Sequence, residues 1–158
     1  MGMREKVAEA LKSAMKEKAA DRLSTLRLIN AAIKDRDIAL RGEGDETVAD
    51  DTEILSILSK MVKQRQESAR AYEEGGRLDL AEREQAEIEI ITEFLPRQMD
   101  EDEVRKAIAA TLTDIGATSI RDMGKVMGAL KSRYNGQMDF GKVGPMVKDQ
   151  LCAAASDC

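Results

Sequence analysis

Apolar residues recur at intervals of three and four positions along almost the whole chain. Side chains at this spacing share one face of an α-helix, whereas a half-buried strand would need strict two-residue alternation. Good helix formers dominate the 158 residues, and only two prolines interrupt them. No segment alternates convincingly, and no internal repeat is visible. The sequence therefore predicts an all-α fold.

Turn and capping residues divide this pattern into seven helices. The predicted breaks are the acidic loop 41–50, Gly75-Gly76, Leu95-Pro96, Gly116 and Asn135-Gly136. The predicted helix starts are Asp21, Asp51 or Thr52, Asp100 with Glu103, Ser119 with Asp122, and Asp139. In the first helix, Val7, Leu11, Ala14, Met15 and Lys18 are expected on one face, and in the fourth Leu78, Ala81, Ile88, Ile91 and Leu95.

Leu95-Pro96 is the strongest boundary, because the residue before a proline is pushed out of the helical region. We expect residues 1–95 to form helical hairpins and residues 100–152 to form a small C-terminal subdomain of three helices. Residues 153–158 are expected to form a frayed tail.

The chain contains no histidine, which excludes a histidine-dependent triad, an imidazole base and a histidine-containing metal site. The glutamates of residues 82–93 suggest a metal site only superficially. Basic residues four positions from acidic ones, as in Lys63/Glu67, Arg70/Glu74 and Arg83/Glu87, indicate a solvated, salt-bridged face instead. No serine or cysteine has a suitable base nearby. We expect no catalytic residue, no metal and no cofactor.

The sequence also bears on cellular location. No stretch reaches the roughly 18 apolar residues of a membrane span, and residues 1–9 lack the apolar core of an export signal. We expect a cytoplasmic protein without a membrane partner.

Charge is sorted along the chain. The net charge is −5, which argues against general nucleic-acid binding and against a DNA partner. Residues 117–148, however, hold six basic and two acidic residues. Arg121, Lys125, Lys131, Arg133 and Lys142 are therefore candidate phosphate-binding residues, with Lys148 nearby. The alternative is that these side chains form an ordinary solvated surface.

Two glycines interrupt the same segment. Gly124 and Gly128 stand four residues apart on one predicted helix face, and each costs about 0.8–1 kcal/mol relative to alanine there. Such glycines indicate close approach of a backbone. They predict packing against another helix or contact with a ligand, and packing is the more usual explanation.

Four segments together resemble the GatB/YqeY family. They are Arg22-Leu-Ser-Thr-Leu-Arg27, Lys63-Gln-Arg-Gln-Glu-Ser68, Ala86-Glu-Ile-Glu89 with Phe94-Leu-Pro96, and Gly116-Ala-Thr-Ser-Ile-Arg-Asp-Met-Gly-Lys-Val-Met127. The resemblance covers about residues 3–151. Members are stand-alone proteins similar to the tail domain of one subunit of the Asp/Glu-tRNA amidotransferase.

This resemblance implies a helical tRNA-binding module, because the amidotransferase tail contacts the outer corner of tRNA. The family label would be carbon–nitrogen ligase with glutamine as amido-N-donor, but that chemistry belongs to other domains and subunits. The chain departs from the family at Phe140, where relatives carry a glycine. Phe140 either removes a tRNA contact or anchors the last helix.

A second hypothesis is a protein–protein adaptor that docks on a synthetase or an amidotransferase core. Nine methionines and an acidic central half suit such a role, because methionine adapts to irregular contact surfaces.

Overall fold

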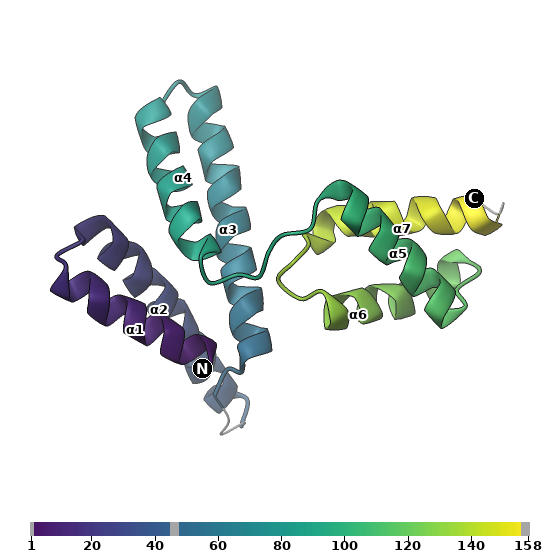
Figure 1. Ribbon diagram of the computed structural model, residues 1–158, viewed down its shortest axis with the longest axis horizontal. Coiled ribbons are helices and arrows are strands. Elements are labelled where there is room, and N and C mark those ends of the chain that lie inside the picture. The colour runs from purple at the N-terminus through teal and green to yellow at the C-terminus, as the bar shows by residue number, and fades with distance from the viewer. Residues whose placement is uncertain (1, 45–47, 156–158) are drawn as a thin grey trace. The chain divides into compact units, whose positions relative to one another are not determined.

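The computed structural model describes residues 2–44 and 48–155 and is all-α, as the sequence predicts. Within these residues there is no strand. The helices are α1 Met3–Lys16, α2 Ala20–Gly42, α3 Asp51–Glu74, α4 Leu78–Thr92, α5 Glu101–Ile115, the short η1 Ile120–Asp122, α6 Met123–Arg133 and α7 Phe140–Ala155 (Figure 1). They form two compact units, Met1–Pro96 and Arg97–Cys158, which we call unit 1 and unit 2.

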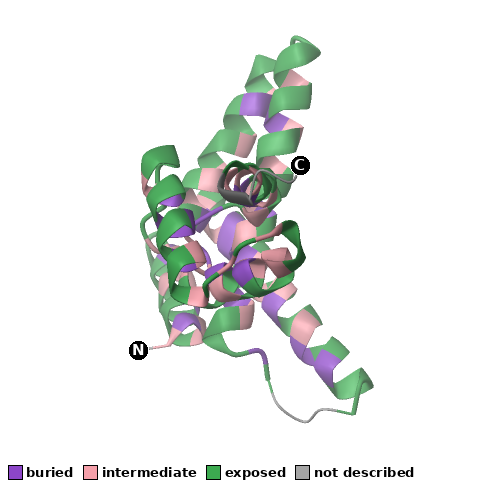
Figure 2. Ribbon diagram, turned by 90° about the vertical axis from the view of Figure 1, so that its right-hand side faces the viewer, coloured by how far each residue is buried: buried purple, intermediate pink, exposed green. Residues whose placement is uncertain are grey.

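Unit 1 consists of two helical hairpins, α1–α2 and α3–α4. Its core is formed by the inward faces of these helices (Figure 2). The largest fully buried side chains in it are Leu26, Ile29, Ile33, Ile54, Leu58 and Ile91. Phe94 and Leu95 pack against this core from the segment after α4, so the last residues of the unit 1 core lie just before Pro96.

The predicted pair of Arg83 with Glu87 is wrong. Glu87 pairs with Arg65 of α3 at 2.9 Å rather than with Arg83, four residues earlier on its own helix. Glu93 pairs with Arg22 of α2 at 2.6 Å. Glu87 of α4 and Glu93 just after it thus link neighbouring helices, because tertiary packing brings distant guanidinium groups close to them.

Three residues of unit 1 lie away from their predicted positions. α1 ends at Lys16, so Lys18 belongs to the following turn, where it has a φ of 56°. Met15 is 55% exposed and Leu78 is 63% exposed, so neither is a core residue. Helix periodicity alone cannot show which end of an apolar face another helix covers.

Of the two predicted helix starts in unit 1, the one at Asp51 is confirmed and the one at Asp21 is wrong. Asp21 lies in the first turn of α2, and the N-cap is Ala19, whose side chain makes no capping bond. The N-cap of α3 is Asp50, whose carboxylate accepts a hydrogen bond from the Glu53 N–H at 2.9 Å. The predicted cap of α2 is therefore two residues too late, whereas α3 begins at Asp51, as predicted. The loop predicted at residues 41–50 begins at residue 43 in the structure, because α2 continues through Gly42. Residues 45–47 of this loop lie outside the described chain.

Unit 2 packs α5, α6 and α7 around one core of Val104, Ala107, Ile108, Val126, Leu130, Met138, Val143, Val147 and Leu151. Asp100 and Glu103 form the predicted capping box at the start of α5. Gly116 ends α5 in the left-handed conformation, where its N–H and that of Ala117 both donate to the Leu112 carbonyl at 3.0 Å. α7 continues to Ala155, so residues 153–155 of the predicted tail are helical. Residues 156–158 of that tail lie outside the described chain.

Candidate nucleic-acid interface

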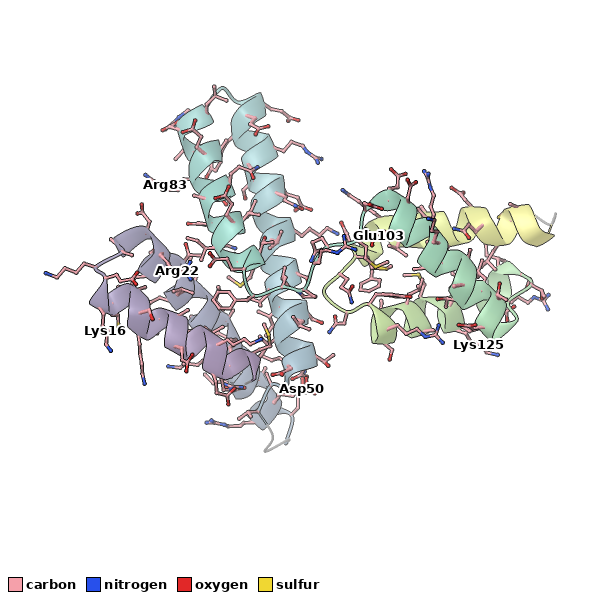
Figure 3. The ribbon with its side chains drawn as sticks, viewed as in Figure 1. Lys16, Arg22, Asp50, Arg83, Glu103 and Lys125 are labelled. Atoms are coloured by element: carbon pink, nitrogen blue, oxygen red, sulfur yellow. The ribbon has the colours of Figure 1, made fainter. Side chains whose placement is uncertain are left out.

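All five predicted phosphate-binding residues are exposed and belong to unit 2. Arg121 lies in η1, Lys125, Lys131 and Arg133 lie on α6, and Lys142 lies in the first turn of α7. Figure 3 shows Lys125 extending away from the ribbon of unit 2. The structure therefore makes these side chains accessible, but it divides them among three elements.

One group of these residues shares the outer face of α6. Lys125 and Lys131 stand three residues before and three residues after Gly128, so they flank it at about 60° to either side of the helix. Gly124 and Ser132 lie one turn to either side of Gly128 along the same face. We call Gly124, Lys125, Gly128, Lys131 and Ser132 the glycine–lysine strip. All five of its residues are exposed.

The two glycines leave the helix backbone of the strip exposed, without a side chain over it. A methyl group built on Gly124 or on Gly128 would meet no atom within 4 Å. The more usual explanation, packing against another helix, is therefore wrong for both positions in this structure. Two residues unfavourable in a helix thus lie on an open face that also carries two lysines, and no packing contact explains their presence.

The start of α6 is held by Asp122. Its carboxylate accepts the backbone N–H groups of Thr118 at 3.0 Å and Ser119 at 3.4 Å, in the predicted capping arrangement. These two N–H groups, with a smaller contribution from Lys125, hold the pKa of Asp122 below its ordinary value. The predicted helix starts at Ser119, but its first turn is the 3₁₀ helix η1 and regular α-helix begins at Met123.

Arg133 and Lys142 do not join the strip. Arg133 lies about 80° around α6 from Lys125, and its guanidinium pairs with Asp114 of α5 at 3.0 Å. Lys142 is carried by a different helix, α7. In contrast, Arg121, Lys125, Lys131 and Lys142 form no ion pair with any residue that the structure describes.

The aromatic residues of unit 2 serve the core. Tyr134 and Phe140 are partly buried and pack against the unit 2 cluster. Phe140 therefore anchors the start of α7, which is one of the two alternatives that the sequence left open. Neither ring is available as a stacking platform on the strip.

Charge alone pointed to the basic residues and did not indicate how they surround Gly128. The spacing of the residues could have indicated this arrangement. Gly128 has a lysine three residues before and after it and a small residue four residues before and after it, and in a helix these positions share one face. Ser132 was not predicted to belong to this face, because only charged residues and glycines indicated the face in the sequence.

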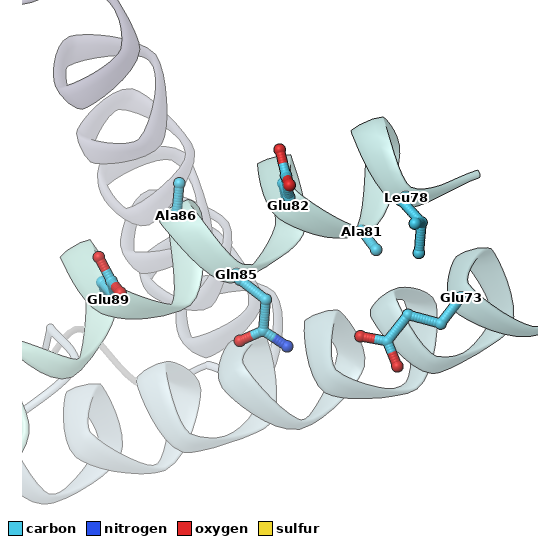
Figure 4. A pocket seen from close by; sticks show the side chains of 7 residues that line it. All are labelled: Glu73, Leu78, Ala81, Glu82, Gln85, Ala86 and Glu89. Carbon is cyan, nitrogen blue, oxygen red and sulfur yellow. The ribbon is translucent and has the colours of Figure 1, made fainter. Parts of the chain in front are cut away.

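A groove between α3 and α4 is a second concave feature. Leu78, Ala81, Glu82, Gln85, Ala86 and Glu89 of α4 line it with Glu73 of α3. Gln85 and Glu73 point into the space between the two helices (Figure 4). Its charged residues are all acidic, and no group of three potential metal ligands occurs within residues 2–44 and 48–155. The groove therefore gives no basis for a catalytic or metal site.

Comparison with known proteins identifies relatives along nearly the full chain. The pattern of the Yqey-like protein family matches residues 4–151. A protein of Clavispora lusitaniae named "Altered inheritance of mitochondria protein 41, mitochondrial" is 32% identical over 93% of this chain and 84% of its own length. Proteins with the same name are 31% identical in Meyerozyma guilliermondii, over 87% of this chain and 71% of the relative, and 29% identical in Saccharomyces cerevisiae strain YJM789, over 76% and 65%.

None of the helices in the described chain is long and apolar enough to cross a membrane. The boundary near Pro96, the glycine–lysine strip and all helical residues except Met3 and 152–155 lie within the 4–151 match. The protein belongs to the YqeY-like family.

Proposed function

We propose that this protein binds tRNA through the outer face of unit 2 and has no catalytic site of its own. The observation that supports this proposal is the glycine–lysine strip, in which Gly128 faces open space between Lys125 and Lys131 and Gly124 faces open space one turn earlier. The resemblance to the amidotransferase tail supplies the class of ligand, and the strip supplies a place for it.

The chemistry of the strip suits a sugar–phosphate backbone. Without a Cβ at Gly124 and Gly128, a ligand can approach the helix backbone more closely than at any other residue type. Lys125 and Lys131 then neutralise phosphates on either side as point charges. Arg121, in η1 just before α6, adds a third cation near the N-terminal end of α6. Recognition of this kind reads backbone shape and charge rather than bases, because the aromatic residues are packed inside.

Charge reversal on the strip tests the proposal. We expect Lys125→Glu/Lys131→Glu to weaken binding to total tRNA and to reduce the salt-dependence slope by about one for each phosphate that is no longer neutralised. Lys60→Glu/Lys106→Glu is the matched control, because both lysines are exposed helical residues away from the strip. Unchanged affinity and slope in the strip variant, or equal affinity for a plain RNA duplex of matched length, would overturn the proposal.

The glycines provide a second test that does not change charge. We expect Gly124→Ala and Gly128→Ala to weaken tRNA binding, because each adds a methyl group where the RNA backbone would lie. Ala129, the residue after Gly128 on α6, shows that the helix accepts an alanine side chain. If both glycine variants bind tRNA as the parent does, close approach to the helix backbone is not part of binding.

The family label of a glutamine-dependent carbon–nitrogen ligase leads to a separate expectation. We propose that the pure chain neither hydrolyses glutamine nor amidates Glu-tRNA, since its sequence offers no suitable base, nucleophile or nucleotide-binding loop for either reaction. Turnover of either substrate by the pure protein would contradict this. We also propose a cytoplasmic location, which fractionation of cells expressing the tagged chain would test. The fungal relatives carry the word mitochondrial in their names.

A further inference from the structure

Helix α2 has an apolar face toward the core and further apolar residues on its opposite face. Leu26, Ile29 and Ile33 are fully buried against the rest of unit 1. On the opposite face, Leu28 is 44% exposed and Ile38 is 62% exposed, with Ala31 also exposed between them. Within unit 1, no described residue covers this second stripe.

A line of basic residues borders the exposed stripe. Arg27, Lys34 and Arg41 follow one another at seven-residue spacing, which keeps them on one side of a helix over about 21 Å. Lys34 and Arg41 lie next to Ile38, at four residues before and three residues after it. All three are exposed, and none forms an ion pair with a carboxylate of the described chain.

A further exposed apolar residue lies in the segment before α3. Ala49 donates its backbone N–H to the Asp37 carboxylate at 2.8 Å, which holds the segment before α3 against the C-terminal half of α2. Val48, the preceding residue, is 54% exposed. Leu28, Ile38 and Val48 thus account for three of the six large hydrophobic residues that are exposed in the described chain.

We propose that the outer face of α2, formed by Arg27, Leu28, Ala31, Lys34, Ile38 and Arg41, is a docking surface for an acidic amphipathic helix of a protein partner. The partner helix would bury its apolar stripe on Leu28, Ala31 and Ile38. Its carboxylates, also spaced by seven residues, would pair with the basic line, as charges beside the seam of a coiled coil do.

The spacing of the basic line favours a helical partner over an extended one. Successive bases are about 10.5 Å apart, the rise of seven helical residues. An extended chain covers that distance in about three residues, whose side chains point alternately to opposite sides. An α-helix with a carboxylate in every heptad matches this interval, whereas a β-strand does not.

RNA fits this surface less well than a protein does. Asp35 stands on the same face, seven residues after Leu28, and repels phosphates and carboxylates alike, so the acidic residues of the partner would lie along the basic line and not over Asp35. The exposed Leu28 and Ile38 offer nothing to a phosphate, whereas apolar residues beside a charged rim are typical of protein interfaces. The surface is on unit 1, so this proposal is independent of the tRNA contact proposed for unit 2.

Amide chemical shifts of the full-length protein, recorded during titration, test the proposal. The probe is a synthetic 21-residue helix with leucines along one stripe and a glutamate in every heptad beside it, and the control peptide carries lysine in place of each glutamate. We expect the acidic peptide to shift amides of residues 24–42 saturably and to bind about tenfold more tightly than the basic peptide.

Variants separate docking from loss of folding. Arg27→Glu/Lys34→Glu and, separately, Ile38→Glu change exposed residues and should each weaken binding of the acidic peptide about tenfold. Lys12→Glu/Lys60→Glu makes the same charge change elsewhere on unit 1 and should leave affinity within about twofold. Absence of shifts in α2, equal binding of both peptides, or displacement of the acidic peptide by tRNA would overturn the proposal.

Discussion

Arg4 of α1 and Asp37 of α2 form an ion pair with two parallel hydrogen bonds, Nη1 to Oδ2 at 2.9 Å and Nη2 to Oδ1 at 3.0 Å. The same guanidinium donates to the Ala49 carbonyl at 3.1 Å, and Asp37 accepts the Ala49 N–H at 2.8 Å. Asp37 is only 8% exposed. The pair therefore joins α1, α2 and the segment that leads into α3.

Removal of Asp37 should destabilise unit 1. Asp37→Ala leaves the Arg4 guanidinium and the Ala49 N–H without their acceptor, which should lower the free energy of unfolding by about 1.5–3 kcal/mol. Urea denaturation followed by circular dichroism measures this difference. Asp35→Ala, at an exposed position on the same helix, is the control and should change stability by less than about 0.5 kcal/mol. Equal effects of the two substitutions would show that the pair contributes nothing.

The same pair predicts a pH dependence. Hydrogen bonding from Arg4 and from the Ala49 N–H holds the pKa of Asp37 below its ordinary value. Because the pKa of Asp37 is lower in the folded protein, the stabilisation from its ion pair is complete above the pKa of an aspartate in the unfolded chain, about 3.9. It is lost as the pH falls through the pKa of Asp37 in the folded protein. We expect Asp37→Asn to reduce the loss of stability between about pH 5 and pH 2 in acid titration. A titration curve of unchanged slope would contradict this assignment.

The glycines of the strip should trade stability for binding. Gly124→Ala and Gly128→Ala should each raise the free energy of unfolding by about 0.8–1 kcal/mol, because the new methyl group meets no atom within 4 Å. Thermal and urea denaturation of the full chain measure the change. Destabilisation by either substitution would reveal a contact at that glycine.

Asp114 should compete with RNA for Arg133. The two side chains are paired at 3.0 Å and are 58% and 47% exposed, so the pair itself adds little stability. If unit 2 binds tRNA, Asp114→Asn should free Arg133, remove one repulsive charge and tighten binding. A gel-shift titration in the Arg133→Ala background supplies the control, since Asp114→Asn should then have a smaller effect. If Asp114→Asn tightens tRNA binding equally in both backgrounds, the tighter binding comes from removal of the acidic charge alone and not from release of Arg133.

Gly116 should be needed where α5 ends. Its φ of 73° lies in the left-handed region, so Gly116→Ala should cost about 1–2 kcal/mol. Gly116→Asn should cost less, because asparagine tolerates this conformation better. Urea denaturation measures the free energy of unfolding of the two variants. Equal stability of Gly116→Ala and the parent would show that glycine is not needed at this position.

Local spacing in the sequence determined the helices and several of their ends. Asp100 and Glu103 are three residues apart, and Gly116 bonds back to Leu112 within the last turn, so these features depend on neighbouring residues alone. The same kind of local motif carries the resemblance to the YqeY-like family and identified the basic segment of unit 2.

Only the tertiary structure decided which partners distant residues acquire. Arg4 and Asp37 are 33 residues apart, Arg65 and Glu87 are 22 apart, and Arg133 and Asp114 are 19 apart. Helical spacing orients each side chain on its own helix but does not tell which helix lies opposite. For that reason the sequence could not show that Gly124 and Gly128 face open space, that Phe140 packs inward, or that Leu28 and Ile38 are left uncovered.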